Sequence, residues 1–487
     1  MIDLTKNEEQ LKRTVERCRE RDIVIPTFSQ MRDPKKVPST IKERLKETGL
    51  WEIAPQNLFR ITWKNEPVDT GGLYRPTPNT MELPPELTGI EARVIALVGK
   101  WFPTGSHKVG ATYGCLIPPL VTGQFDPTKH KAVWPSTGNY CRGGAYNATL
   151  LACESIAILP EEMSRERFDW LRTVSGEIIT TPGGESNVKE IYDKVWDLRR
   201  TREDIHVFNQ FSEFGNYLYH HDVTGPAMEE ALERAGAGKY SGVCLTTGSA
   251  GTLACGDYLK NRHPTSKIAA GEALQCPTML LSGFGAHRIE GIGDKHIPWI
   301  HNVRNTDMAI AIDDEDVMSL MRLFNEPAGR EYLIEDIGVP EDIVSKLDLL
   351  GISSIANLLM CVKYARYYEL TGRDMVLTVF TDSMDLYRSR LREAREKLGD
   401  YSERDAIRDH SRCLLGQKTD AMLELTHYQR RQIHNLKYFT WIEQQGFDLD
   451  ELNRQWHDHE DYWQSIRDLT PEIDRLIEEF NERVDLI

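Results

Sequence analysis

Three short segments of this sequence carry residue types that could do chemistry together. Lys108 lies in residues 103–110, Pro-Thr-Gly-Ser-His-Lys-Val-Gly. A Ser-Thr-Gly-Asn run follows at residues 136–139, and Thr-Thr-Gly-Ser-Ala-Gly-Thr follows at residues 246–252. A lysine amine forms a Schiff base with an aldehyde and can then move protons. The order of the three segments predicts a site for pyridoxal phosphate and for an amino acid bound to it.

Residues 246–252 have the composition and the context of a phosphate site. They follow the apolar run Val243-Cys244-Leu245 and precede a helical stretch, so backbone N–H groups can converge on an anion at a helix N-terminus. Each such hydrogen bond contributes roughly 1.5–3 kcal/mol, more than the ~0.3–1 kcal/mol of a helix dipole. Alone, the run also fits an ordinary strand–helix turn; its order after Lys108 favours phosphate. The predicted cofactor contacts here are Thr247, Gly248, Ser249, Ala250, Gly251 and Thr252.

The other two segments should supply the catalytic lysine and the substrate site. Lys108 follows a strand ending near Gly99 and should open a helix, although a surface lysine at a helix start would look the same. Ser136 and Thr137, after a strand at residues 132–134, can hold a substrate carboxylate, and Asn139 can bind the ring oxygen of the cofactor. A glycine turn with an N-cap serine is the alternative interpretation of that loop.

A further loop, Thr381-Asp382-Ser383, follows the apolar run at residues 375–380. A hydroxyl at the pyridine nitrogen would not keep that nitrogen protonated, so the ring would be a weaker electron sink. This favours loss of a β-leaving group over transamination. A helix N-cap after a strand is the alternative role of Ser383, and both roles are compatible.

Composition excludes several classes of protein. The 487 residues carry a net charge of −16, which argues against nucleic acid and against an anionic membrane as partners. The nine cysteines are scattered without a paired motif, which fits a reducing cytoplasm. The N-terminus is too polar for a signal peptide, and no apolar run approaches the roughly 18 residues of a membrane span.

No metal site is predicted, and Cys141 has two possible roles. His457 and His459 are better explained by a solvated helix end than by a metal. Cys141 could be a reactive thiol beside the cofactor, but a small packing residue is the more frequent role.

The pattern of apolar residues predicts an α/β protein with three parts. Residues 1–73 are predicted as a helical extension, beginning with a capping box of Thr5 and Glu8. Residues 74–390 alternate buried, mostly parallel strands with helices and form the catalytic core, with a small domain at about 110–225 inserted in a larger one. Strands should stop near residue 391, and residues 391–487 are predicted as a helical extension that ends in a helix capped by Thr470.

Several motifs in the order found here resemble the cysteine synthase/cystathionine β-synthase-like group, the tryptophan synthase β-like fold type II of pyridoxal phosphate enzymes. The resemblance covers about residues 74–390. Its motifs are residues 75–78 (Arg-Pro-Thr-Pro), 163–167 (Met-Ser-Arg-Glu-Arg), 181–184 (Thr-Pro-Gly-Gly), 209–212 (Asn-Gln-Phe-Ser), 224–226 (Thr-Gly-Pro), 289–293 (Ile-Glu-Gly-Ile-Gly), 297–298 (Ile-Pro) and 350–354 (Leu-Gly-Ile-Ser-Ser).

The resemblance implies roles for particular residues. Gln210 would bind the substrate carboxylate with Ser136 and Thr137, and Ser383 would meet the pyridine nitrogen. His107 resembles the tryptophan synthase β pattern, in which this histidine approaches the phosphate. The implied reaction is β-replacement on an amino acid with a β-leaving group, through an aminoacrylate intermediate.

Departures from the family pattern keep other reactions open. Val109-Gly110 follows the lysine, and Tyr140 and Cys141 replace small residues after Asn139. β-Elimination to a keto acid and ammonia, or cleavage of an amino keto acid with a partner subunit, are therefore alternatives, and a non-catalytic binding subunit is a third. Homodimers are usual in the group that the sequence resembles.

Overall fold

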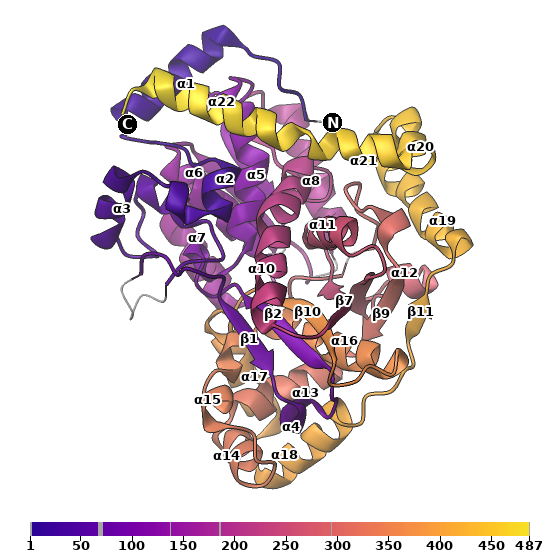
Figure 1. Ribbon diagram of the computed structural model, residues 1–487. Coiled ribbons are helices and arrows are strands. Elements are labelled where there is room, and N and C mark those ends of the chain that lie inside the picture. Colours follow the sequence, from indigo (N-terminus) through magenta and orange to yellow (C-terminus); the bar gives the residue numbers. More distant parts are fainter. Residues whose placement is uncertain (1, 67–71, 137, 185–186, 294, 487) are drawn as a thin grey trace.

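The structure is a computed structural model that describes residues 2–66, 72–136, 138–184, 187–293 and 295–486. Two sheets organise the molecule, with helices packed around both (Figure 1). The α/β class predicted from the sequence is confirmed, with mostly parallel sheets flanked by helices and additional helices towards the C-terminus.

The larger sheet has seven strands in the order β1-β2-β10-β7-β8-β9-β11. Its inner strands are parallel, whereas β1 pairs with β2 and β11 pairs with β9 in antiparallel fashion. Strand bounds are β1 (Thr80–Leu83), β2 (Arg93–Val98), β7 (Lys239–Thr246), β8 (Lys267–Ala273), β9 (Met308–Ile312), β10 (Asp374–Phe380) and β11 (Met422–Glu424).

The smaller sheet has four parallel strands in the order β5-β4-β3-β6. Its strands are β3 (Lys131–Pro135), β4 (Ser155–Pro160), β5 (Glu177–Thr181) and β6 (Ile205–Val207). The apolar runs predicted as strands at residues 94–98, 132–134, 155–159, 243–245 and 375–380 all lie in strands.

Both sheets are covered on two faces, which explains why their strands are almost continuously apolar. In β2, Ile95 and Leu97 face a core shared with α10 and α11, while Val94 and Ala96 face a core shared with α13 and α16. The smaller sheet is packed in the same way between α6 and α8. The helices of this central part are α4 (Pro85–Thr88), α5 (Lys108–Val121), α6 (Asn139–Leu150), α7 (Arg165–Val174), α8 (Val188–Thr201), α9 (Phe214–Tyr219), α10 (Gly225–Ala235), α11 (Ala254–Arg262), α12 (Thr278–Leu281), α13 (Asp314–Asn325), α14 (Pro327–Glu335), α15 (Glu341–Val344) and α16 (Ile352–Tyr367).

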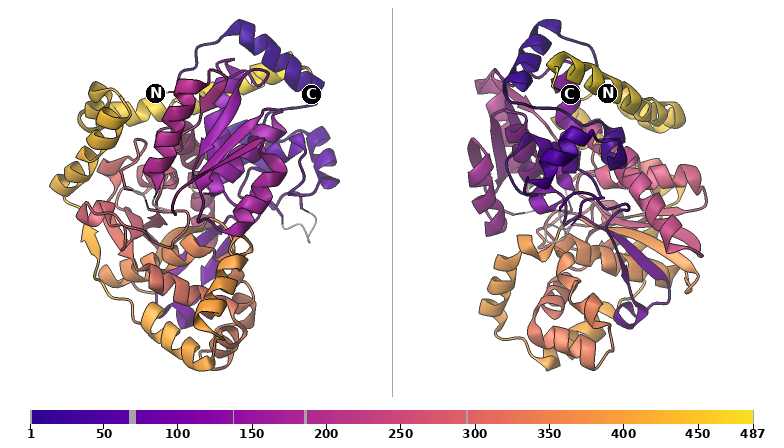
Figure 2. Two further views of the ribbon diagram at one scale, coloured as in Figure 1. Left: turned by 180° about the vertical axis from the view of Figure 1, so that it is seen from behind. Right: turned by 60° about the vertical axis from the view of Figure 1, so that its left-hand side comes forward.

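The first and last helices of the chain lie side by side (Figures 1 and 2). The first and last helices exchange polar contacts, with Arg483 paired to Glu8 at 2.9 Å and Arg19 Nε donating to the Val484 carbonyl at 3.0 Å. The helices of the two terminal segments are α1 (Glu8–Glu20), α2 (Phe28–Arg32), α3 (Ser39–Lys46), α17 (Arg388–Leu398), α18 (Glu403–Asp409), α19 (His427–Asn435), α20 (Leu449–His457), α21 (His459–Arg467) and α22 (Leu469–Val484).

Three local predictions are wrong. Asn7, not a Thr5 capping box, caps α1, because its side chain accepts from the Gln10 N–H. Strands do not stop near residue 391, since β11 adds to the edge of the large sheet. Thr470 is not the cap of α22: the helix begins at Leu469, and the Thr470 hydroxyl donates to Asp222 at 2.5 Å.

The domain boundaries predicted from the sequence stay a proposal. Within the described residues, no helix has both the length and the apolar character that a membrane span requires.

Candidate active site

The predicted site residues come from five loops that each follow the carboxyl end of a parallel strand. Lys108 follows β2, the phosphate loop follows β7, and Ser383 follows β10 in the larger sheet. Ser136 follows β3 and Gln210 follows β6 in the smaller sheet. Ligands of open α/β sheets bind outside the carboxyl ends of the strands, so this arrangement brings two half-sites together from two sheets.

Lys108 begins α5, as the sequence predicted, and reaches the loop after β7. Its Nζ donates to Ser249 Oγ at 3.0 Å, and Ser249 Oγ also accepts from Asn216 Nδ2 at 3.1 Å. Lys108, His107 and residues 246–250 line one small pocket together with Thr252, Gly291, Ile292, Ser353 and Thr381. The lysine and the predicted phosphate loop therefore share one cavity.

The loop at residues 246–252 has features that fit a phosphate group. Thr247 Oγ1 is buried, and within the described residues it has no hydrogen-bond partner. Ala250 adopts a left-handed conformation with φ 63°, which costs free energy in a residue other than glycine and is typical of functional turns. A Cβ on Gly251 would lie 2.0 Å from Asn216 Oδ1, so only glycine fits there.

His107 is a neutral imidazole in this site. Burial and then the neighbouring Lys108 charge lower the pKa of His107 to about 3. Its Nδ1–H donates to the Thr381 carbonyl at 3.4 Å, which leaves Nε2 as the acceptor for the Thr252 hydroxyl at 3.3 Å. His107 consequently lies beside the loop that the sequence assigned to the phosphate.

The substrate side of the site is joined to the cofactor side by one asparagine. Gln210 Nε2 donates to Ser136 Oγ at 3.0 Å, so the two residues predicted to hold the carboxylate are in contact. Asn216 Nδ2 donates both to the Gln210 carbonyl at 3.0 Å and to Ser249. Thr137, the third predicted carboxylate ligand, lies outside the described residues.

Asn139 and Ser383 lie on either side of a buried aspartate. Asn139 Nδ2 donates to Asp382 Oδ2 at 2.5 Å, and Tyr387 donates to the same oxygen at 2.7 Å. Asn139 Oδ1 is buried without a partner among the described residues, which leaves hydrogen-bonding capacity for a ligand. Ser383 lies two residues after Thr381, which lines the shared pocket. Its hydroxyl donates to Asp385 at 3.4 Å. Burial raises the pKa of Asp382, although the Tyr387 hydrogen bond and Arg167 oppose that shift.

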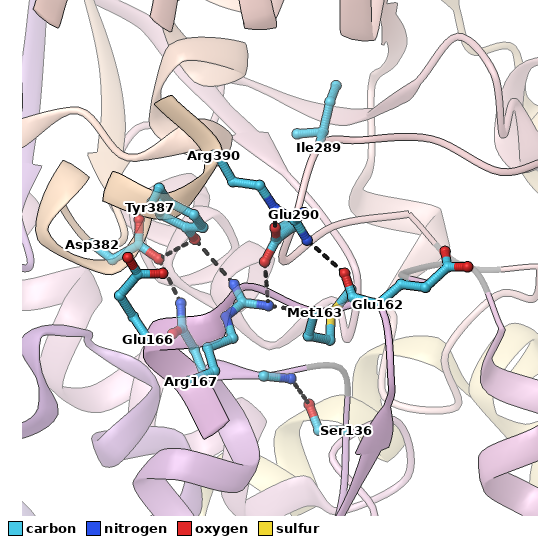
Figure 3. A network of polar contacts seen from close by, with 12 residues as sticks. Ser136, Glu162, Met163, Glu166, Arg167, Ile289, Glu290, Asp382, Tyr387 and Arg390 are labelled. Atoms are coloured by element: carbon cyan, nitrogen blue, oxygen red, sulfur yellow. Dashed lines mark hydrogen bonds and ion pairs between the residues drawn. The ribbon is translucent and has the colours of Figure 1, made fainter. Parts of the chain in front are cut away.

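A buried ion-pair network stands behind the substrate loop (Figure 3). Arg167 Nη1 pairs with Glu290 at 2.9 Å, and both side chains are at most 4% exposed. Arg167 Nη2 donates to Tyr387 at 3.1 Å, and Arg390 Nε pairs with the other Glu290 oxygen at 2.6 Å. A Cβ on Gly138 would lie 2.3 Å from Arg167 Nη1, so the guanidinium packs directly on the loop.

Sequence reasoning missed the residues that hold these loops in place. Arg167 and Glu290 lie inside two motifs that carried the family resemblance, but no role was predicted for either. Asn216, Asp382 and Tyr387 were missed as well, because each contacts a partner far away in the chain, namely Ser249, Asn139 and Arg167 respectively. Cys141 is a packing residue: its thiol donates to the Gly138 carbonyl at 2.9 Å, and burial raises its pKa to about 12.

A larger cavity of about 700 Å³ lies on the other side of Glu290. Met163, Glu290, Arg390, Met318 and Tyr401 are among its lining residues. Glu290 lines this cavity, and the next residue, Gly291, lines the Lys108 pocket. Two consecutive residues therefore border the two cavities. No group of three or more His, Cys, Asp or Glu side chains in the described part of the chain is placed to hold a metal ion.

The central part of the chain is similar in sequence to a known class of protein. A family model described as pyridoxal-phosphate dependent enzyme matches residues 99–330. The match confirms the predicted cofactor class and the resemblance to fold type II enzymes.

Individual relatives are similar to this chain over its central part. A probable cysteine synthase of Bacillus subtilis (strain 168) is 29% identical over 221 residues, which is 45% of this chain and 70% of the relative. Cystathionine beta-synthase of Saccharomyces cerevisiae is 24% identical over 313 residues, 62% of this chain and 58% of the relative.

Solved structures share the fold. Cysteine synthase from Entamoeba histolytica has a TM-score of 0.56 at 22% identity and covers 70% of this chain and 93% of its own. An O-acetylserine dependent cystathionine beta-synthase from Helicobacter pylori has a TM-score of 0.53 at 24% identity and covers 64% and 94%.

Proposed function

We propose that this protein is a pyridoxal phosphate enzyme that catalyses β-replacement on an amino acid with a β-leaving group. One observation carries the proposal: Lys108 contacts Ser249 in a pocket lined by the loop after β7, and Asn216 joins that serine to the Ser136–Gln210 pair. Cofactor-side and substrate-side groups thus meet at the carboxyl ends of two sheets. The relatives named as cysteine synthases support the reaction class.

Each residue then has a defined task. When bound, pyridoxal phosphate withdraws electrons from the substrate Cα and so favours loss of its proton and of the β-group. Lys108 holds the cofactor through its amine and, once released, takes the Cα proton. Residues Thr247, Gly248, Ser249, Ala250, Gly251 and Thr252 bind the phosphate with His107 beside them.

The substrate-side residues orient the amino acid. Ser136 and Gln210, together with Thr137, hold the carboxylate, and Asn139 faces the ring oxygen with its remaining hydrogen-bonding capacity. Ser383 meets the pyridine nitrogen without protonating it, so the electron withdrawal suits β-chemistry better than transamination. The Arg167–Glu290 pair keeps this loop in place.

Titration of the purified yellow protein with candidate donors tests the proposal. The panel is serine, O-acetylserine, O-phosphoserine, cysteine, threonine and diaminopropionate, and visible absorbance is recorded for each. We expect one of them to shift the absorbance band, and added sulfide or thiol to restore the original band with formation of a new amino acid. A keto acid and ammonia formed without any nucleophile would assign elimination instead, and no shift with any donor would contradict the proposal.

We also propose a homodimer in a reducing compartment. All nine cysteines are buried, and the sequence has no paired cysteine motif, as expected where disulfides do not form. Leu281 and Phe284 are 69% and 70% exposed within one short segment after β8, which is unusual for apolar side chains of a monomer. Sedimentation should give the mass of two chains, and Phe284→Asp should shift it towards one; an unchanged dimer in that variant would exclude this segment as the contact.

A further inference from the structure

Residues 291–293 and 295–301, called the segment below, contact both halves of the proposed site. Gly291 and Ile292 line the Lys108 pocket, and the Gly293 N–H donates to the Thr247 carbonyl at 3.0 Å. Further along, the Ile300 N–H donates to the carbonyl of Phe211, the neighbour of Gln210, at 3.3 Å. A displacement of this segment would therefore move the phosphate loop and the carboxylate-binding residue together.

The outer side of the segment is held by the C-terminal arm, defined here as residues 427–467. Trp441 Nε1 donates to the Ile297 carbonyl at 2.8 Å. Lys437 Nζ donates to the Trp299 carbonyl at 2.9 Å and to the His301 carbonyl at 2.8 Å. Two side chains of the arm thus bind three backbone carbonyls at alternate positions of a five-residue stretch.

Lys437 is placed for this contact and not for an ion pair. The side chain is fully buried, and its third hydrogen bond goes to Gln455 Oε1 at 2.7 Å. Three acceptors require three N–H donors, so the amine is protonated even though burial lowers its pKa strongly. Burying a cation with no carboxylate among these contacts costs free energy. The backbone carbonyls of one segment offset part of that cost by accepting hydrogen bonds from the amine.

Packing supports the same contact. The imidazole of His296 lies between Phe211, at a ring distance of 4.8 Å, and Trp441, at 5.6 Å. The Tyr192 hydroxyl of α8 and His296 Nε2 share a hydrogen bond at 3.2 Å, and burial lowers the pKa of this histidine to about 3, which keeps the imidazole neutral. His296 of the segment therefore contacts both Trp441 of the arm and Tyr192 of α8.

We propose that Lys437 and Trp441 are positioning residues of the active site: they fix the backbone of residues 297–301 so that residues 291–293 close the cofactor pocket and Phe211 holds Gln210 in place. The effect on turnover rests on the proposed function, whereas the effects on backbone exchange and on cofactor binding do not. Neither residue touches the reacting atoms.

Two variants of the arm and one control test this proposal. Lys437→Met keeps the length of the side chain and removes all three donors, and Trp441→Phe removes one donor while keeping an aromatic ring. The control is Lys363→Met, because Lys363 is a buried lysine, 4% exposed against 0% for Lys437, that pairs with Asp420 away from this segment. Hydrogen–deuterium exchange is followed in peptides covering residues 287–301, and the affinity for pyridoxal phosphate is measured by fluorescence.

We expect exchange at residues 289–293 to accelerate by about tenfold in Lys437→Met and by a smaller factor in Trp441→Phe. The affinity for pyridoxal phosphate should weaken in the same order, KM for the amino acid should rise more than kcat falls, and Lys363→Met should resemble the wild type. If Lys437→Met does not fold, exchange at residues 289–293 and cofactor affinity in Trp441→Phe alone decide whether the proposal holds.

Exchange at residues 289–293 and cofactor affinity that match the control in both variants would overturn the proposal. The same two quantities changing as expected in a protein that carries out no β-replacement would leave the positioning role intact and contradict only the proposed function.

Discussion

The phosphate loop and the substrate loop are built alike but are held in place differently. Both are glycine-containing turns between a parallel strand and a helix. The loop at residues 246–252 has Ala250 in the left-handed region and is held by neutral groups, since Asn216 packs against Gly251 and the Gly293 N–H donates to the Thr247 carbonyl. The loop at residues 136–139 is supported by buried charges, with Arg167 packed on Gly138 and Asp382 bound to Asn139.

This difference has a consequence for what each loop tolerates. Removing one neutral hydrogen-bond partner typically costs about 0.5–1.5 kcal/mol. Breaking a buried ion pair by removing one partner typically costs about 3–5 kcal/mol when the other charge is left without compensation. Loss of a single supporting partner should therefore damage the substrate loop more than the phosphate loop.

Replacement of Lys108 should have the largest effect on turnover, because the phosphate loop and the substrate loop both position groups around this lysine. Lys108→Ala removes the cofactor attachment and the base, and loss of a general base alone lowers kcat by roughly 10²–10⁴-fold. Steady-state turnover measures the effect, with Lys131→Ala, at the start of β3, as the control. Full activity in Lys108→Ala would contradict the mechanism.

Removal of Arg167 should damage the substrate side next most. Arg167→Met leaves Glu290 with Arg390 as its remaining partner and should lower the free energy of unfolding by less than the about 3–5 kcal/mol expected for a fully uncompensated buried charge. Urea unfolding measures this loss. The double variant Arg167→Met with Glu290→Leu should be less destabilised than the sum of the single variants; additive losses would show that the two residues act independently.

The same small substitution in both loops compares them directly. A Cβ at Gly138 meets Arg167 at 2.3 Å, and one at Gly251 meets Asn216 at 2.0 Å. Each overpacked site should cost about 1–3 kcal/mol. We expect Gly138→Ala to raise KM for the amino acid and Gly251→Ala to weaken cofactor binding; if both variants changed only one of these constants, the two loops would not divide the work as proposed.

Ser383→Asp should change the reaction more than the fold. A carboxylate at the pyridine nitrogen would keep it protonated and make the ring a stronger electron sink. β-Chemistry should slow while side transamination rises, and the ratio of the products, measured by chromatography, reports the change. An unchanged ratio would count against the placement of Ser383 at that nitrogen.

The smallest effect concerns His107 and pH. Its pKa of about 3 lies below that of a histidine in an unfolded chain, near 6.5. As pH falls from about 6.5 towards 3, the unfolded chain takes up a proton that the folded protein does not, so this residue lowers stability with falling pH. His107→Asn should flatten that part of the stability curve in acid unfolding, and an unchanged slope would contradict a neutral, buried His107.

The sequence was sufficient for the phosphate-loop half of the site. Val243-Cys244-Leu245, the small residues after it and the helix that follows are neighbours in the chain, so strand, turn and helix could be predicted together. Lys108 at the start of α5 was predicted for the same local reason.

The charge-supported half was not predictable in this way. Asn139 and Asp382 are 243 residues apart, and Arg167 and Tyr387 are 220 residues apart, so no local pattern marks either contact. The short strand β11 escaped detection because three residues carry no clear alternation and pair only with the edge of β9. The capping of α1 was misassigned because Thr5 and Asn7 both have side chains suited to an N-cap.

Chemical trapping of the cofactor on its lysine tests the central claim most directly. The yellow protein is reduced with borohydride, digested, and analysed by mass spectrometry for a phosphopyridoxyl group. We predict that the group is found on the peptide containing Lys108 and that Lys108→Ala abolishes it. A phosphopyridoxyl group on another lysine, or none on a protein saturated with pyridoxal phosphate, would contradict the assignment of this site.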